Sequence, residues 1–140
     1  LRFAQLSIEQ GQSPSMAPLN DLFALLALRA GRPAELEQLS TPAPGEMLDP
    51  PMRKRQMLWH CWRGALDEAF AVAFDSADHY AREGSVGGAW GVLWLPEMQA
   101  FRDDGRFQLF ARRLRLFEYW SEYGPPDGYS LKGEHLVRAA

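Results

Sequence analysis

The glycines and prolines of this sequence fall at intervals that limit it to a series of short helices. Between these breaks, apolar residues recur every three or four positions, which is the spacing of a helix buried on one side. Gly31 is suited to a left-handed helix cap, Pro33 can occupy the first position of a helix, and a later helix ends at Gly64. No stretch alternates between apolar and polar residues for long enough to require a sheet. The sequence therefore predicts an all-α fold.

The same breaks define where each helix and loop should lie. We expect helices at residues 1–10, 19–30, 33–39, 51–63, 66–83, 96–104 and from 107 to no further than 123. A length of 140 residues is usual for one domain. Its expected parts are degenerate helices at 1–40, a linker at 41–50, the clearest repeat at 51–84, a capping segment at 85–128 and a tail at 129–140. Within the tail, residues 132–140 could be a short terminal helix or frayed.

An internal repeat links two of these helix breaks. Gly31 and Gly64 stand 33 residues apart, and each ends one helix before another begins. Stacked helix pairs of the tetratricopeptide type have a period of about 34 residues. The segment Gly64–Ala69 resembles the turn and the start of the second helix of that repeat, with the small Ala69 where two helices approach closely. We expect Ala24 and Ala73 at similar contacts.

The C-terminal third carries a second resemblance. The relevant segments are, in order, Leu93–Met98, Phe101–Phe107, Leu114–Leu116, Tyr119–Trp120 and Pro126–Gly128. Together they resemble the closing segment of tetratricopeptide regions in bacterial signalling proteins, such as those attached to winged-helix regulators or to adenylate-cyclase domains. Gly105 stands where that family usually has proline. The resemblance implies a helical sensor or interaction region, with neither DNA binding nor cyclase activity, which belong to other domains.

Charge and composition exclude several classes of function. A net charge of −3 argues against a general nucleic-acid binder. The longest apolar run, Leu22–Leu28, is far shorter than the roughly 20 residues of a membrane span. The single cysteine, Cys61, leaves no internal disulfide and no Cys-based zinc site, but it does not fix the compartment. Because the chain starts at Leu1 in a helical pattern, we expect a fragment of a longer protein.

Two clusters on the predicted helices could carry chemistry. Asp75, His79 and Glu83 share one helix face and could ligate a metal, but a solvated, salt-bridged face explains them better. His60 and Cys61 are neighbours whose side chains point about 100° apart, so they do not form a nucleophile–base pair. We therefore expect no catalytic site, no metal and no cofactor.

Charged pairs in the last helix have equally plain explanations. Glu118 and Glu122 lie one turn apart without a second carboxylate pair facing them, so we interpret them as a solvated face. Arg112, Arg113 and Arg115 could contact a phosphate, but nearby acidic residues favour surface exposure or internal ion pairs.

Aromatic residues give two further alternatives. Trp90, Trp94, Tyr119 and Trp120 could form a ligand platform, although a cap over the end of the helical stack is the favoured interpretation. Phe107, Phe110, Leu114, Tyr119 and Trp120 should then fold back onto the last repeat helix as a lid.

The predicted function is binding of a protein or peptide in a groove lined by the first helix of each pair. The expected groove residues are Asp21, Leu25, Arg29, Lys54, Leu58 and Trp62. Trp62 serves there as an anchor, and the flanking charges set the orientation of the partner. Alternatively, Trp62 is buried in the core and contacts no partner. For the whole chain the alternatives are a structural domain that packs on its own longer chain or forms a homodimer, and a small-molecule sensor or enzyme built on the aromatic cluster.

Overall fold

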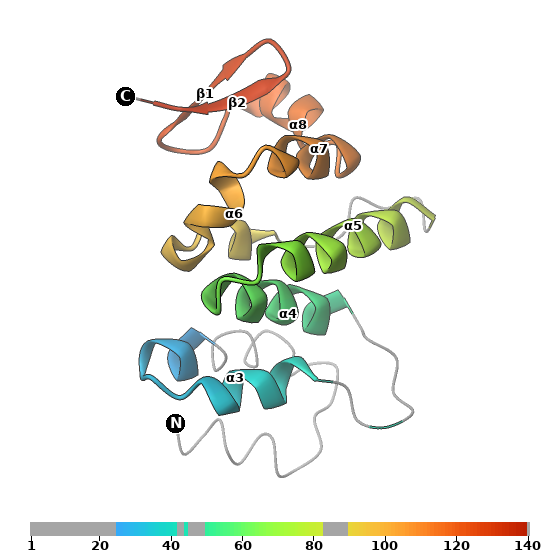
Figure 1. Cartoon of the computed structure of the whole chain (residues 1–140). Helices are drawn as coiled ribbons and strands as arrows, with labels where there is room; N and C mark the ends of the chain where they lie inside the picture. Colours follow the sequence, from blue (N-terminus) through green and yellow to red (C-terminus); the bar gives the residue numbers. More distant parts are fainter. Residues whose placement is uncertain (1–24, 42–43, 45–49, 83–89, 140) are drawn as a thin grey trace. The chain divides into compact units, whose positions relative to one another are not determined.

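The computed structural model describes residues 25–41, 44, 50–82 and 90–139 (Figure 1). The expected helix at 1–10, the first half of the one at 19–30 and most of the linker lie outside the described residues. The chain divides into two compact units, Leu1–Val72 and Ala73–Ala140, and the boundary between these ranges falls within the sequence of helix α5.

The first unit is built from helices. Residues 25–29 are helical and are followed by α3 (Pro33–Ser40), α4 (Pro50–Trp62) and the first part of α5 (Leu66–Arg82). Helices α3 and α4 pack against each other. Its buried apolar side chains are Ala27, Leu28, Met57, Leu58, Cys61, Ala69 and Phe70. Ala69 is fully buried, as expected of a residue at a close helix contact, whereas Ala24 lies outside the described residues.

Gly31 has the left-handed backbone conformation that the sequence predicts, and Gly64 has the same conformation. Gly31 has φ of 71° and Gly64 has φ of 78°, in the left-handed region that favours glycine. At the first cap, the Gly31 N–H donates to Leu28 O and the Arg32 N–H donates to Ala27 O. The cap at Gly64 repeats the same two bonds, from Gly64 to Cys61 and from Ala65 to His60. The two turns that stand one repeat apart therefore have the same hydrogen-bonded geometry.

The second unit consists of short helices followed by a hairpin. After the end of α5 come η2 (Gly91–Trp94), η3 (Pro96–Met98), α6 (Gln99–Asp103), α7 (Arg106–Arg113) and α8 (Leu116–Tyr123). Phe110 lies at the centre of the core. Its ring makes edge contacts with Phe74, Trp90 and Phe101 at centroid distances of 6.3, 5.4 and 5.8 Å.

One helix of the prediction is divided into two. Residues 107–123 were expected as a continuous helix, but Arg115 adopts a left-handed conformation with φ of 59°, so α7 ends at Arg113 and α8 begins at Leu116. The break is stabilised by the Arg115 N–H, which donates to Arg112 O. Because apolar residues continue at helical spacing through this turn, the break is invisible in the pattern.

The tail is a β-hairpin, so the expectation of a terminal helix or frayed segment was wrong. Strand β1 (Tyr129–Lys132) pairs antiparallel with β2 (His135–Arg138). The two-residue turn begins at Gly133, whose φ of 60° suits a type II′ turn with glycine in the first position. The fold is therefore mostly helical with a small hairpin, rather than all-α. Within the described part of the chain, no helix is long and apolar enough to cross a bilayer.

Candidate functional site

The C-terminal end of α4 presents two tryptophans at the surface. Trp59 and Trp62 stack with their ring centroids 5.7 Å apart and their planes at 21°. Trp62 is 43% exposed, while Trp59 is half-buried. The helical spacing of three residues places both indoles on one side of α4.

The groove residues expected from the sequence are divided between surface and core. Arg29 and Trp62 are exposed, and Leu25 and Lys54 are half-buried. Leu58 is only 3% exposed, so this side chain is part of the core of the first unit and cannot form the open centre of a groove. The sixth residue, Asp21, lies outside the described residues.

His60 and Cys61, beside the tryptophans, have no features of a catalytic pair. Burial raises the pKa of the Cys61 thiol to about 12, so the thiol stays protonated at neutral pH and is a poor nucleophile. Burial, followed by the charge of Arg63, lowers the pKa of His60. The neutral ring accepts a hydrogen bond at Nδ1 from Arg63 Nε, 3.2 Å away.

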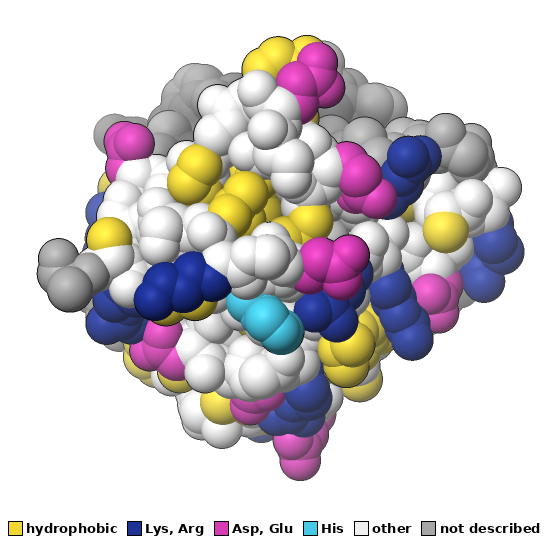
Figure 2. Space-filling view, turned by 90° about the horizontal axis from the view of Figure 1, so that it is seen from above, with side chains coloured by type: hydrophobic (Ala, Val, Ile, Leu, Met, Phe, Trp, Pro, Cys, Tyr) yellow, Lys and Arg dark blue, Asp and Glu magenta, His cyan; other side chains and the backbone are white. Residues whose placement is uncertain are grey.

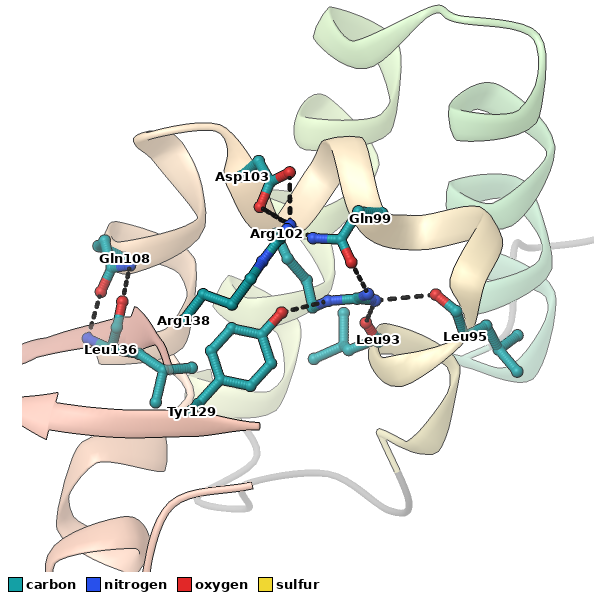
Figure 3. Close-up of polar contacts among 9 residues, drawn as sticks. All are labelled: Leu93, Leu95, Gln99, Arg102, Asp103, Gln108, Tyr129, Leu136 and Arg138. Atoms are coloured by element: carbon teal, nitrogen blue, oxygen red, sulfur yellow. Dashed lines mark hydrogen bonds and ion pairs between the residues drawn. The ribbon is translucent and has the colours of Figure 1, made fainter. Parts of the chain in front are cut away.

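A buried arginine organises the second unit (Figure 3). Arg102 of α6 is 9% exposed, and its Nη1 donates to the carbonyl oxygens of Leu93 at 2.5 Å and Leu95 at 2.8 Å. Its Nε donates to the Tyr129 hydroxyl at 2.8 Å, and its Nη2 donates to Gln99 Oε1 at 2.8 Å. One guanidinium thus joins the η2 turn, α6 and the hairpin.

Two further side chains attach the hairpin to the helices. Gln108 of α7 accepts a bond from the Leu136 N–H and donates one to Leu136 O, both at 3.0 Å. Arg138 Nη2 contacts the two carboxylate oxygens of Asp103 at 2.8 and 2.9 Å. Figure 3 shows both contacts beside the Arg102 network. The hairpin is therefore fixed to α6 and α7 by polar contacts that the sequence pattern did not indicate.

A cavity of about 690 Å³ lies where the hairpin meets α6 and η2. The side chains that matter chemically along its wall are Trp94, Gln99, Arg102, Asp127, Tyr129 and Arg138. The wall thus combines two guanidinium groups, one carboxylate and two aromatic rings. Of these residues, only Trp94 was expected from the sequence as a candidate ligand contact. The others are far apart in the sequence and come together only in the folded chain, so no local pattern marks them.

The aromatic cluster has a mixed outcome. Trp90 and Trp120 are buried, Trp94 is half-buried and lines the cavity, and Tyr119 is 57% exposed beside Tyr123. Of the residues expected to form a lid, Phe107, Phe110, Leu114 and Trp120 are buried. Tyr119 belongs to neither the cluster nor the lid.

Comparison of the chain with known protein families, with curated proteins and with solved structures found no match. The resemblance to tetratricopeptide regions therefore remains a prediction from the residues.

Two of the arginines expected at the surface, Arg113 and Arg115, form ion pairs there. Asp78 of α5 pairs with Arg113 at 3.3 Å, and Glu118 pairs with Arg115 at 3.9 Å, both between well-exposed side chains. In the face shown in Figure 2, basic and acidic side chains are interspersed rather than gathered by sign. Glu83 lies outside the described residues, and among those described no three His, Cys, Asp or Glu side chains form a group that could hold a metal.

Proposed function

We propose that this chain is a non-catalytic module that binds a protein or peptide through the surface of α4. The observation that supports this proposal is the stacked pair of Trp59 and Trp62, with Trp62 43% exposed. A large aromatic side chain at the surface excludes water when a partner covers it, and tryptophan is enriched among residues that dominate binding energy.

The charge of α4 defines the partner more closely. The helix contains the half-buried Arg53 and Lys54, the buried Arg55 and no acidic residue, while the whole chain has a net charge of −3. A basic helix on an acidic chain favours a complementary acidic partner. The proposed ligand is therefore a peptide segment in which an apolar anchor, placed against Trp62, is flanked by Asp or Glu.

The test is a selection from a random peptide library displayed on phage, followed by affinity measurements with synthetic peptides. We expect the selected peptides to combine acidic and apolar residues. Trp62→Ala should weaken their binding about thirtyfold, as expected for an interface anchor worth at least 2 kcal/mol. The control is Leu109→Ala, which removes a side chain that is 52% exposed on α7.

Two results would contradict the proposal. Peptides that bind Trp62→Ala as tightly as the unchanged chain would show that α4 is not the site. Peptides enriched in Lys and Arg would show that the charge of α4 does not select the partner.

A further inference from the structure

The cavity in the second unit contains a buried positive charge whose hydrogen-bond partners are all neutral. Arginine is always charged in proteins and carries five N–H donors. In Arg102, four of these donate to two backbone carbonyls, one amide oxygen and one phenol oxygen. None of these oxygens carries a charge that would neutralise the guanidinium.

A second arginine on the same wall retains donors for a ligand. Arg138 contacts Asp103 through Nη2, and within the described residues its Nε and Nη1 have no acceptor. Arg138 is exposed, so these groups are accessible from the cavity side or from solvent. Planar guanidinium groups match the two oxygens of a carboxylate in a fork-like geometry.

The aromatic part of the wall is packed against neighbouring rings. Trp94 makes edge contacts with Phe107, Trp120 and Tyr129 at centroid distances of 6.2, 6.0 and 5.7 Å. The indole and the phenol ring therefore present a fixed apolar surface beside the two guanidinium groups. The cavity volume of about 690 Å³ lies within the range of roughly 300–1,000 Å³ that is typical of small-molecule sites.

We propose that this cavity binds a small aromatic carboxylate, with the acid group at Arg138 and Arg102 and the ring against Trp94 and Tyr129. The charges favour a ligand with one negative charge over one with two, because Asp127 on the wall and Asp103, the ion-pair partner of Arg138, already offset the charge of the two arginines. A phosphate monoester carries about −1.5 to −2 at neutral pH and fits that balance less well. This site is separate from α4 and does not depend on the peptide-binding proposal.

The test uses four probes that share a phenyl ring and differ in charge: phenylacetate, phenylacetamide, phenethylamine and phenyl phosphate. Binding is followed by the NMR signals of the Trp94 Nε1–H and the Arg138 Nε–H. We expect phenylacetate to bind about tenfold more tightly than the neutral amide, as for a hydrogen bond to a charged group. Phenethylamine should show no binding, and phenyl phosphate should bind more weakly than phenylacetate.

Three variants separate the role of charge from that of structure. Arg138→Gln should weaken phenylacetate binding about tenfold. Asp103→Asn breaks the ion pair between Asp103 and Arg138 but keeps the guanidinium of Arg138. This variant should therefore bind phenylacetate at least as well as the unchanged chain. Asp127→Asn removes a repulsive charge and should strengthen binding about threefold. Trp62→Ala should have no effect, which distinguishes this site from the one on α4.

Equal affinity for phenylacetate and phenylacetamide would overturn the proposal. So would undiminished binding by Arg138→Gln, or tighter binding of phenyl phosphate than of phenylacetate. If Arg138→Gln fails to fold, the Asp127→Asn variant still decides, because unchanged or weaker binding by that variant contradicts a carboxylate in this cavity.

Discussion

Helices are interrupted both at Gly64 and in the second unit, but the contacts that stabilise the two regions differ. Neighbouring backbone groups stabilise the turn at Gly64, whereas side chains that join distant segments stabilise the second unit. At Gly64, backbone bonds from Gly64 to Cys61 and from Ala65 to His60 close the turn within six residues. In the second unit, Arg102 connects carbonyls of η2 to the hydroxyl of Tyr129, 27 positions away. A local break needs only one glycine, whereas the second unit depends on a few polar side chains that join distant segments.

We expect the largest loss of stability when Arg102 is replaced. Replacing Arg102 with Ala leaves two carbonyls and the Tyr129 hydroxyl without their donor, so we expect a loss of about 3 kcal/mol or more in the free energy of unfolding. The loss should appear in the second unit, as faster hydrogen exchange at β1 and β2, while α4 amides keep their protection.

Arg102→Lys sharpens the same test. Lysine keeps the charge but cannot reach four acceptors with a rigid fork, so it should recover only a minor part of the loss. Unchanged exchange at β1 and β2 in Arg102→Ala would mean that Gln108 and Arg138 hold the hairpin without Arg102.

The same contrast explains what could be predicted from the sequence. The ends of α3 and α4 fall within one residue of the expected ranges, because proline and glycine act on the backbone where they stand. The hairpin was missed because four-residue strands are too short for alternation to identify. Gly133, between Lys132 and Glu134, was the one available signal for its turn.

The candidate sites were predicted less well than the helices. Trp62 is exposed, so its place in a groove stays a prediction, whereas Leu58 was also placed in the groove although it is buried. Residues four positions apart on a helix point about 40° away from each other. On α4 this rotation is enough for Trp62 to lie at the surface while Leu58 is buried in the core. The cavity could not be predicted, because Arg102, Tyr129 and Arg138 share no local pattern and meet only after folding.

Helix packing in the first unit gives the next largest effect. Ala69 of α5 is fully buried, whereas Ala71, two residues later, is exposed. Ala69→Leu should overpack the core and cost about 1–3 kcal/mol in urea unfolding, whereas the matched Ala71→Leu should stay within about 0.5 kcal/mol of the original. Equal stabilities for the two variants would contradict close packing at Ala69.

The glycine cap should respond on a smaller scale. Gly64 has φ of 78° with no atom within 4 Å of an added Cβ, so Gly64→Ala is strained by backbone conformation alone. We expect a loss of about 1 kcal/mol in the thermal unfolding of the first unit. Gly31→Ala should cost a similar amount, because the two caps make the same bonds. If only one of the two variants lost stability, the two turns would share their hydrogen bonds but differ in how much glycine contributes to stability.

The smallest effect has the opposite sign and concerns Gly105, between α6 and α7. Its φ of −57° lies in the range of proline, and the preceding Asp104 has φ of −76° and ψ of 138°, which a following proline allows. An added Cβ meets no atom within 4 Å, and in the described part of the chain the Gly105 N–H has no backbone acceptor. Gly105→Pro should therefore stabilise the second unit by about 0.4–1 kcal/mol by restricting the unfolded chain.

Urea unfolding measures the gain in stability of Gly105→Pro, and Gly105→Ala should give part of that gain. A loss of stability would mean that the turn requires glycine for a reason other than its backbone angles. A gain would show that the break between α6 and α7, like the cap at Gly64, is set by local backbone conformation even within the unit that long-range contacts hold together.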